Sequence, residues 1–241
     1  MRTKAPRGQN FLYQSAWLER VADAAAAPGA RVPRLVEIGG GPGGLTERLA
    51  PRAEQFWVVE SDPALAEGLR ARFPGQVVEA DVLEVDLSAL AGGERLHVAG
   101  NLPYYITSPI LLHLFRHAAV IAEAVVMVQR EVADRLVAAP GKREFGLLTA
   151  TTQLYCRPQR LFDLPPGAFR PPPRVHSSVV RLTFAPRAAA LGVDEAAFLR
   201  FLRTAFAQKR KQLGKRLGIP LAARAEELSL EELAALFKQL E

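Results

Sequence analysis

Polar residues and glycines recur at a regular interval along the N-terminal part of the chain, each directly after a short apolar run. Glu60 lies 21 residues after Gly39, Asp81 lies 21 residues after Glu60, and Asn101 lies 20 residues after Asp81. Segments with helical spacing, such as residues 63–73, separate the apolar runs. Alternating strands and helices at this spacing predict a parallel sheet with helices on both faces. We therefore expect an α/β fold.

The same pattern assigns the other elements. We predict strands at 34–38, 55–59, 76–79, 95–99 and 123–128, and helices at 14–27, 46–49, 63–73, 109–117 and 130–138. Two further strands, 147–155 and 177–184, have no full helix between them and can form an antiparallel hairpin at a sheet edge. Helical patterns at 194–217 and 229–240 follow Pro186. We expect one domain over 1–185 and a small helical domain over 186–241.

Composition narrows the class of protein. The 241 residues carry a net charge of +6, which favours a polyanionic partner such as nucleic acid or an acidic membrane surface. Cys156 is the single cysteine, so an internal disulfide and a cysteine-rich metal site are excluded, and we expect a buried thiol and no metal. The basic N-terminus lacks a following apolar segment, and the chain has no apolar run of about 18 residues. A cytoplasmic protein is the simplest expectation.

The glycine-rich segment 38–46 follows a predicted strand and precedes a helix. Glycines at 39, 41 and 43 let the backbone turn sharply and approach a ligand, although a tight turn or a dinucleotide loop would have the same spacing. Glu60 is placed to accept hydrogen bonds from ribose hydroxyls, and Asp81 from an adenine amino group. Because open α/β sheets bind ligands at the carboxyl ends of their strands, the register favours a nucleoside cofactor.

Asn101-Leu102-Pro103-Tyr104 follows the fourth strand and matches the signature of methyltransferases that modify exocyclic amino groups. The Asn101 side-chain oxygen and the carbonyl of Leu102 or Pro103 can accept both amino hydrogens of an adenine and stabilise positive charge on its nitrogen. Tyr104 offers a flat face for an extruded base. Alone, the segment is as typical of a turn as of a catalytic site. Beside the cofactor residues, the catalytic interpretation is favoured, with S-adenosylmethionine as cofactor.

A rigid proline-rich segment, 168–175, precedes the last predicted strand. It can project Phe169 to the other face of the target base, as a second catalytic aromatic. A structural edge loop is the alternative interpretation of the same segment.

The chain resembles the ribosomal RNA adenine dimethyltransferase family, and within it the bacterial small-subunit (16S) branch. Matching segments run almost end to end: 8–12, 37–46, 59–60, Asp81, 101–111, 128–133, 145–148, 165–178 and 205–213. The resemblance implies a Rossmann-like class I methyltransferase domain with a helical C-terminal domain. It also implies that Asn10 and Leu12 close over the cofactor, which Gly39, Gly41, Glu60, Asp81 and Asn101 bind. The implied reaction is N6,N6-dimethylation of two adjacent adenines in a 3′-terminal hairpin of small-subunit ribosomal RNA, during small-subunit maturation.

The chain departs from the family pattern in four places, one of which is the basic motif, where Lys209-Arg210-Lys211-Gln212-Leu213 leads to Gly214-Lys215 instead of the usual continuation. Arg7 replaces a usual aromatic, and Gln14 stands where an acid is common. The segment between Leu217 and Arg224 looks roughly one helix short. Because the resemblance implies that the C-terminal domain helps to select the RNA, the departures in that domain bear on the choice of RNA more than on the chemistry.

A basic stretch in the C-terminal part predicts contact with RNA phosphates. Arg203, Lys209, Arg210 and Lys211 lie in 200–216, a segment without acids and with an apolar face. A solvated helix face would show the same charges, but the catalytic residues favour RNA binding. We expect the immature small ribosomal subunit as partner, no membrane, and a monomer.

Three alternatives remain. A large-subunit ribosomal RNA adenine methyltransferase of the macrolide-resistance type shares the fold and chemistry, although Leu102 and the 169–175 segment favour the small-subunit branch. A non-catalytic assembly factor would tolerate loss of Asn101 and Glu60, yet both are present. A nicotinamide-dependent oxidoreductase lacks support, because no Tyr-x-x-x-Lys acid is present.

Overall fold

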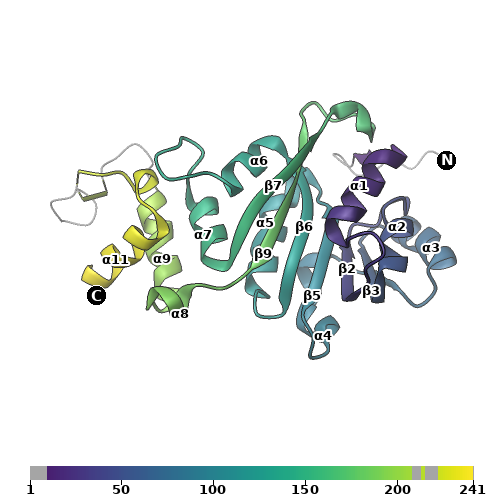
Figure 1. Cartoon of the computed structure of the whole chain (residues 1–241), viewed down its shortest axis with the longest axis horizontal. Helices are drawn as coiled ribbons and strands as arrows, with labels where there is room; N and C mark the ends of the chain where they lie inside the picture. The colour runs from purple at the N-terminus through teal and green to yellow at the C-terminus, as the bar shows by residue number, and fades with distance from the viewer. Residues whose placement is uncertain (1–9, 208–212, 215–221, 241) are drawn as a thin grey trace. The chain divides into compact units, whose positions relative to one another are not determined.

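The computed structural model describes residues 10–207, 213–214 and 222–240. Its centre is a seven-stranded sheet with the strand order β4-β3-β2-β5-β6-β9-β7 (Figure 1). The strands are β2 (Val32–Ile38), β3 (Ala53–Glu60), β4 (Val77–Glu79), β5 (Leu96–Asn101), β6 (Ile121–Gln129), β7 (Cys156–Leu164) and β9 (Ser177–Phe184). β2, β3, β4, β5 and β6 pair in parallel, whereas β9 pairs antiparallel with β6. The expected α/β class with a mostly parallel sheet is confirmed.

Helices cover both faces of this sheet. They are α1 (Ser15–Ala25), α2 (Thr46–Leu49), α3 (Pro63–Arg72), α4 (Leu87–Ala91) and α5 (Thr107–Arg116). A core cluster joins α1, α2 and α3 to one face through buried residues such as Val21, Leu49 and Leu69. On the other face, the ring of Phe115 on α5 lies 6.3 Å from that of Phe184 on β9. The apolar spacing predicted for α1 therefore reflects packing against the sheet.

Local caps explain where individual helices begin. Asp62 precedes α3, and its Oδ1 accepts hydrogen bonds from the amides of Ala64 and Leu65 at 2.9 and 3.1 Å. Asp194 caps α9 (Glu195–Phe206) in the same way, with its Oδ1 2.8 Å from the amide of Ala197. Such caps satisfy amides that have no partner within the helix.

The strand predicted at 147–155 is wrong, because these residues form the helix α7 (Leu147–Tyr155). The segment is rich in β-branched threonine, which favours strands in isolation. In the fold, Thr152 donates to the carbonyl of Leu148 at 2.7 Å, and Thr149 donates to the carbonyl of Arg135 at 2.6 Å. Backbone oxygens thus satisfy the buried hydroxyls within a helical environment. The sheet edge beside β9 is formed by β7 instead.

A short second sheet pairs two segments that are distant in sequence. β1 (Phe11–Leu12) runs antiparallel to β8 (Phe169–Arg170), with Leu12 opposite Phe169. The side chain of Gln14 also donates to the carbonyl of Gly167 at 3.0 Å. These bonds attach the residues after position 10 to the loop before β9.

The chain divides into two compact units, one of Met1–Arg130 with Gln159–Phe184 and the other of Glu131–Pro158 with Ala185–Glu241. The expected boundary at residues 185/186 therefore misplaces residues 131–158, which belong to the second unit. The reason lies in their partners: the ring of Phe145 lies 6.0 Å from that of Phe206, and the hydroxyl of Tyr155 donates to Glu195 at 2.7 Å.

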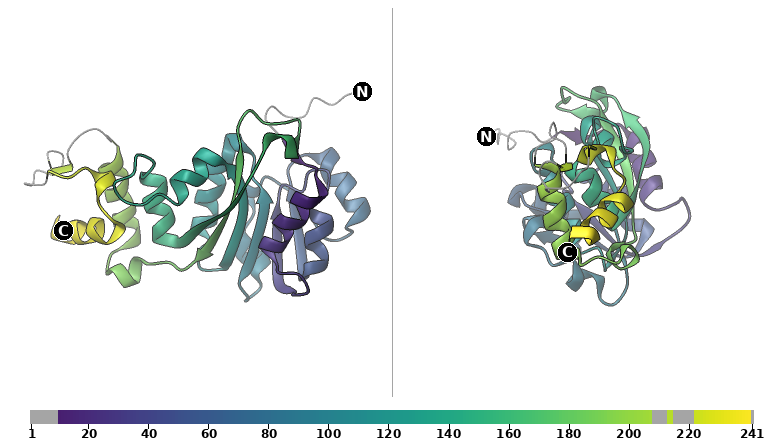
Figure 2. Two further views of the ribbon diagram at one scale, coloured as in Figure 1. Left: turned by 45° about the horizontal axis from the view of Figure 1, so that its top comes forward. Right: turned by 90° about the vertical axis from the view of Figure 1, so that its left-hand side faces the viewer.

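The second unit is helical in its described part. It contains most of α6 (Arg130–Leu136) together with α7, α8 (Ala188–Leu191), α9 and α11 (Leu230–Leu240). α9 and α11 pack against each other (Figure 2), and Phe198 and Phe237 meet between them with ring centroids 5.4 Å apart. Within the described residues, no helix is long and apolar enough to cross a membrane.

The close approach of β2 and β5 depends on Gly100. This residue pairs with Ile38, and a Cβ at position 100 would lie 2.5 Å from the carbonyl oxygen of Ile38. Backbone atoms cannot yield as a flexible side chain can, so a residue with a side chain would force the two strands apart. Gly100 thereby fixes the position of Asn101, its neighbour in the chain.

One carboxylate interrupts the apolar core. Glu37 on β2 is 1% exposed, and its Oε2 has no hydrogen-bond partner within the described structure. Burial raises the pKa of Glu37 to about 8, the nearby Thr46 hydroxyl opposes the rise, and the negative charge of Glu60 adds to it. Folding therefore favours the protonated form of this side chain.

The raised pKa of Glu37 predicts a pH-dependent stability. The contribution of protonated Glu37 to the free energy of unfolding is complete below pH 4.5, the ordinary pKa of a glutamate. This contribution is lost as the pH rises to about 8, the pKa of Glu37 in the folded protein. We expect Glu37→Gln, which cannot ionise, to gain free energy of unfolding relative to wild type between pH 5 and 8. Urea unfolding of both proteins at several pH values measures this difference. A constant difference over that range would contradict the prediction.

Candidate active site

The carboxyl ends of four parallel strands, β2 to β5, meet at one edge of the sheet, and a pocket opens there. We call it the inner pocket. Its lining includes most of the predicted cofactor and catalytic residues: Asn10, Gly39, Gly41, Glu60, Asp81, Asn101, Leu102, Pro103 and Tyr104. Residues spread over more than ninety positions of the sequence thus face one space.

The loop after β2 needs its glycines. Gly39, Gly41 and Gly43 have φ angles of 76°, 52° and 87°, in the left-handed region that disfavours other residues. A Cβ on Gly41 would also lie 2.8 Å from the ring of Phe11, which therefore lies close against the loop. The result is a cradle of bare backbone, open to a ligand that must approach closely.

Glu60 connects this loop to the end of β3. Its side chain is buried, with Oε2 accepting from the amide of Gly41 and Oε1 from the amide of Asp62, both at 2.9 Å. These bonds fix the carboxylate at the pocket wall. A carboxylate has about four acceptor positions, so Glu60 retains capacity for two ribose hydroxyls.

Asp81 stands at the next strand end, where it caps the 3-10 helix η2 (Val82–Glu84). Its Oδ1 accepts from the amide of Leu83 at 2.9 Å. The cap uses one carboxylate oxygen and holds the side chain at the pocket. The exposed side chain is therefore positioned to accept a bond from an adenine amino group.

The Asn101 amide is oriented by its neighbour in the N-terminal segment. Its Nδ2 donates to the carbonyl of Asn10 at 2.7 Å, which leaves Oδ1 to accept a hydrogen from a substrate. The carbonyl of Pro103 already accepts from the amide of Ile106 at 3.2 Å and the hydroxyl of Thr107 at 3.0 Å. Of the two carbonyls that the sequence left open, that of Leu102 is therefore the better second acceptor.

A second space, which we call the outer pocket, adjoins the inner one. It is lined by Asn10, Tyr104, Tyr105, Gln129 and the segment 172–175. Asn10, Tyr104 and Tyr105 line both pockets, so the two spaces meet at these side chains. Tyr105 is 61% exposed, more than the other exposed large hydrophobic side chains of the described residues.

Two predicted residues do not line the inner pocket. Phe169 is 1% exposed and belongs to the core cluster, together with its strand partner Leu12. The expectation that Phe169 offers a face to the target base is not met in this structure. Leu12 is also buried, and it lines a smaller neighbouring space beside Gly39 and Asn101.

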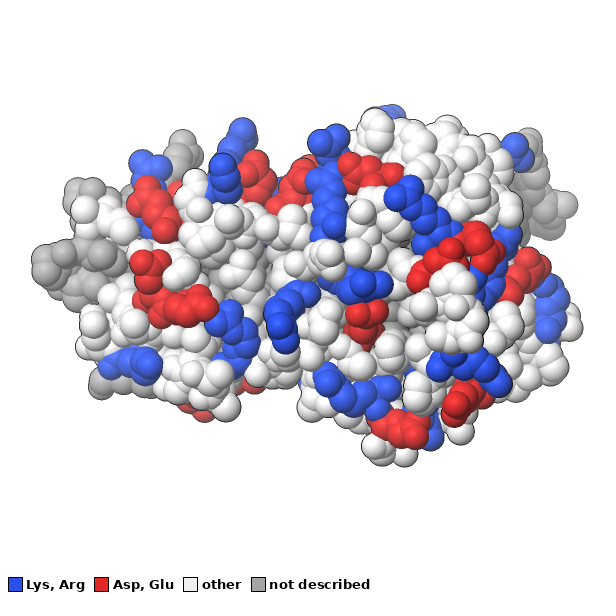
Figure 3. All heavy atoms as spheres, in the orientation of Figure 1, with Lys and Arg blue, Asp and Glu red and all other residues white. Residues whose placement is uncertain are grey.

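The predicted RNA-contacting residues are only partly visible. Arg203 is exposed on α9, whereas Lys209, Arg210 and Lys211 lie outside the described residues. On the face shown in Figure 3, Lys and Arg side chains alternate with Asp and Glu instead of forming one positive field. Charge on this face alone therefore does not mark an RNA surface.

Sequence reasoning missed several side chains that the structure brings to the site. Phe11 lies against Gly41, and Gln129 lines the outer pocket. Tyr105 directly follows the catalytic signature, so its position was a usable signal. Ser177, which contacts the hydroxyl of Tyr104, had no such signal, because strand register alone brings it there.

The arrangement suits the transfer of a group from a nucleoside in the inner pocket to a planar base in the outer pocket. The inner pocket provides acceptors for a nucleoside and bare backbone, and the outer pocket provides exposed aromatic faces. Asn101 belongs to the inner pocket, and Asn10, whose carbonyl accepts from its side chain, lines both.

Comparisons with known proteins identify the family of this chain. The family described as ribosomal RNA adenine dimethylase matches residues 2–235. A ribosomal RNA small subunit methyltransferase A of Acidobacterium capsulatum is 52% identical, over 99% of this chain and 91% of its own length. The protein of the same name from Koribacter versatilis is 42% identical, over 98% of this chain and 94% of its own length.

Solved structures confirm the fold. A dimethyladenosine transferase from Plasmodium falciparum has a TM-score of 0.79 at 22% identity, covering 95% of this chain and 98% of its own. The 23S rRNA methyltransferase ErmE has a TM-score of 0.73 at 26% identity, covering 96% and 99%. With the family match spanning nearly the whole sequence, this chain belongs to the ribosomal RNA adenine dimethylases and is an S-adenosylmethionine-dependent rRNA adenine dimethyltransferase.

Proposed function

We propose that this enzyme dimethylates N6 of two adjacent adenines in a 3′-terminal hairpin of small-subunit ribosomal RNA during small-subunit maturation. The names of the relatives, which align with almost the entire chain, support the small-subunit target. The observation that carries the chemistry is the position of Asn101 beside the junction of the inner and outer pockets.

We further propose that this enzyme acts in the cytoplasm as a monomer. A doubled mass in analytical ultracentrifugation would contradict the proposed monomer.

The residues of the inner pocket fit the cofactor. The cradle at Gly39 and Gly41 admits close contact with a ligand, Glu60 accepts from ribose hydroxyls, and Asp81 accepts from the adenine amino group. Asn10 lies over this pocket through its bond with Asn101. When bound, S-adenosylmethionine supplies a methyl group on a positively charged sulfur, which makes that methyl an electrophile.

The outer pocket is proposed to hold the target adenine. An adenine in a duplex or hairpin must leave its stack to reach an enclosed site, and aromatic faces such as those of Tyr104 and Tyr105 offset the lost stacking. Asn101 Oδ1 and the carbonyl of Leu102 accept the two amino hydrogens. This pair orients the nitrogen lone pair toward the inner pocket and stabilises the positive charge that develops on nitrogen.

No strong base is required at this site. The methylated nitrogen is acidic once it carries four substituents, so its proton passes to water at the pocket mouth. In a second transfer, the one remaining amino hydrogen is donated to one of these two acceptors, and the methyl group takes the place of the other hydrogen.

The choice between small-subunit and large-subunit RNA is tested by direct comparison. We expect radiolabelled methyl groups to enter purified immature small subunits, and to enter protein-free large-subunit RNA far less. The 26% identity to ErmE makes the second substrate the relevant rival. Preferential labelling of large-subunit RNA would overturn the proposed target and leave the enzyme class intact.

Replacing Asn101 tests the proposed chemistry. Asn101→Ala removes one acceptor of the amino hydrogens, and we expect the single-turnover rate of methyl transfer to fall about 100- to 1,000-fold. Asn101→Asp keeps an acceptor oxygen and should retain more activity than the alanine variant. Calorimetry with S-adenosylhomocysteine checks that the cofactor still binds. Equal rates for Asn101→Ala and wild type would exclude the role assigned to Asn101.

We also propose that Arg203, Lys209, Arg210 and Lys211 contact RNA phosphates. The exposure of Arg203 on α9 supports this for the one described member of the set. Each phosphate contact releases counterions, so replacing the three residues 209–211 with alanine should weaken binding to the subunit and flatten its salt dependence. Filter binding at several salt concentrations measures both. If the salt dependence of binding did not change, the side chains at 209–211 would not contact RNA phosphates.

A further inference from the structure

We infer that Ser177 is a positioning residue for catalysis: its hydroxyl fixes the ring of Tyr104 in the plane on which the target adenine stacks. The inference rests on the proposed function of the outer pocket. Its starting observation is that the Tyr104 hydroxyl and the Ser177 Oγ lie 2.6 Å apart, although the residues are 73 positions apart in sequence. That distance is typical of a good hydrogen bond between hydroxyls.

Ser177 stands on a rigid support. It is the first residue of β9, it pairs with Gln129 at the end of β6, and it is fully buried. The amide of Arg130 also donates to the carbonyl of His176 at 3.0 Å, so backbone bonds flank the serine. Because strand ends with such pairing hold their backbone in place, the position of the Ser177 hydroxyl is set by the sheet.

Tyr104, by contrast, needs an anchor. It lies on the 3-10 turn η3 (Tyr104–Ile106) rather than on a strand, and it lines both pockets. A tyrosine ring is fixed at Cα but can tilt and swing at its far end. A bond at the hydroxyl, the atom farthest from the backbone, removes that freedom.

The pKa of Tyr104 is consistent with an uncharged phenol in the hydrogen bond with Ser177. Burial raises the pKa of Tyr104, and the bond with Ser177 opposes the rise. The phenol therefore remains protonated at neutral pH, with one proton to give and an oxygen that accepts. Ser177 is fully buried, so it cannot contact a base in the outer pocket and must act through Tyr104.

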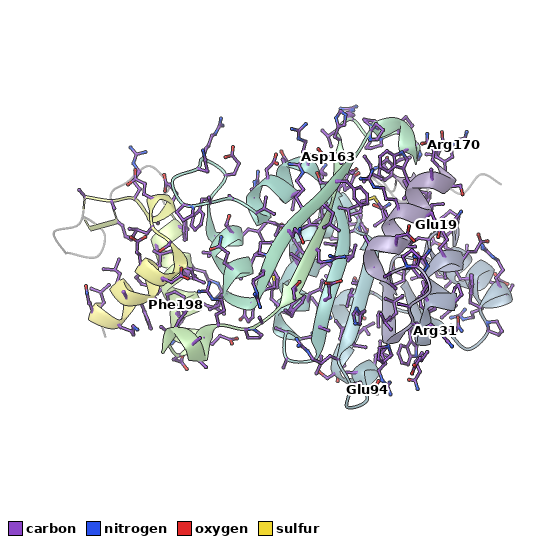
Figure 4. All side chains as sticks on the ribbon, viewed as in Figure 1. Glu19, Arg31, Glu94, Asp163, Arg170 and Phe198 are labelled. Carbon is purple, nitrogen blue, oxygen red and sulfur yellow. The ribbon has the colours of Figure 1, made fainter. Side chains whose placement is uncertain are left out.

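The next residue in the chain supplies a matched control. Ser178 is as buried as Ser177, but side chains alternate along a strand, so it points to the opposite face of the sheet. There it donates to Asp163 Oδ1 at 2.6 Å, and Asp163 also pairs with Arg160. Figure 4 shows Asp163 on the edge strand β7. Ser178→Ala therefore removes an equally buried hydroxyl bond away from Tyr104.

The test is a double-mutant cycle of Ser177→Ala and Tyr104→Phe, measured as single-turnover methyl transfer at saturating cofactor. Each variant removes one hydroxyl of the same bond, so each should slow transfer about tenfold, and the double variant should be no slower than either single variant. Binding of S-adenosylhomocysteine should not change. Ser177→Thr, which keeps a hydroxyl, should recover most of the rate, and Ser178→Ala should stay within about twofold of wild type.

Three results would overturn the inference. A wild-type rate for Ser177→Ala would remove the role altogether. Multiplying losses in the double variant would show that Ser177 does not act through the Tyr104 hydroxyl. An equal loss in Ser178→Ala would assign the effect to general packing of β9.

Failure of the proposed function gives a different pattern. The rate ratios are taken on whichever ribosomal RNA the wild type methylates, so a wrong subunit assignment leaves them valid. If wild type methylates neither RNA, the same cycle measured by urea unfolding still reports whether the two hydroxyls are coupled. Additive effects on stability would then refute the bond itself.

Discussion

The parallel pairing of β2 with β3 and β5 is the constraint on which the site depends. The carboxyl ends of parallel strands lie at the same edge of the sheet, so the residues that follow each strand lie close together there. The pairing must be close, and Gly100 permits this because a Cβ would meet the carbonyl of Ile38 at 2.5 Å. Asn101 and the glycine loop consequently face each other, and the carbonyl of Asn10 holds the Asn101 amide from the N-terminal side.

Charge at this edge is concentrated and largely desolvated. Glu60 is held by two backbone amides, while Glu37 is buried nearby with an unpartnered oxygen. Burial is the main reason that the pKa of Glu37 is raised to about 8, and the negative charge of Glu60 adds to the rise. The fold thus places the hydrogen-bonded Glu60 at the pocket and favours the protonated form of Glu37 in the core.

The outer pocket depends on elements that are remote in sequence. The β1–β8 pair attaches residues 11–12 to the segment before β9, and β9 returns beside β6 to place Ser177 under Tyr104. The same pairing buries Phe169 and leaves Tyr104, Tyr105 and residues 172–175 as the lining.

Local sequence patterns were enough to predict which functional residues stand at the ends of strands, namely Gly39, Glu60, Asp81 and Asn101. Apolar periodicity and glycine spacing are properties of short segments, so they can be recognised without the fold. Tertiary structure decided what local pattern cannot encode. Residues 147–155 form the helix α7, which packs against α9 and α11, and the Thr149 hydroxyl donates to the distant Arg135 carbonyl. Phe169 is buried in the core, where it pairs with Leu12. Likewise, Ser177 reaches Tyr104 only through the register of β9 on β6, a long-range pairing that no local window of sequence contains.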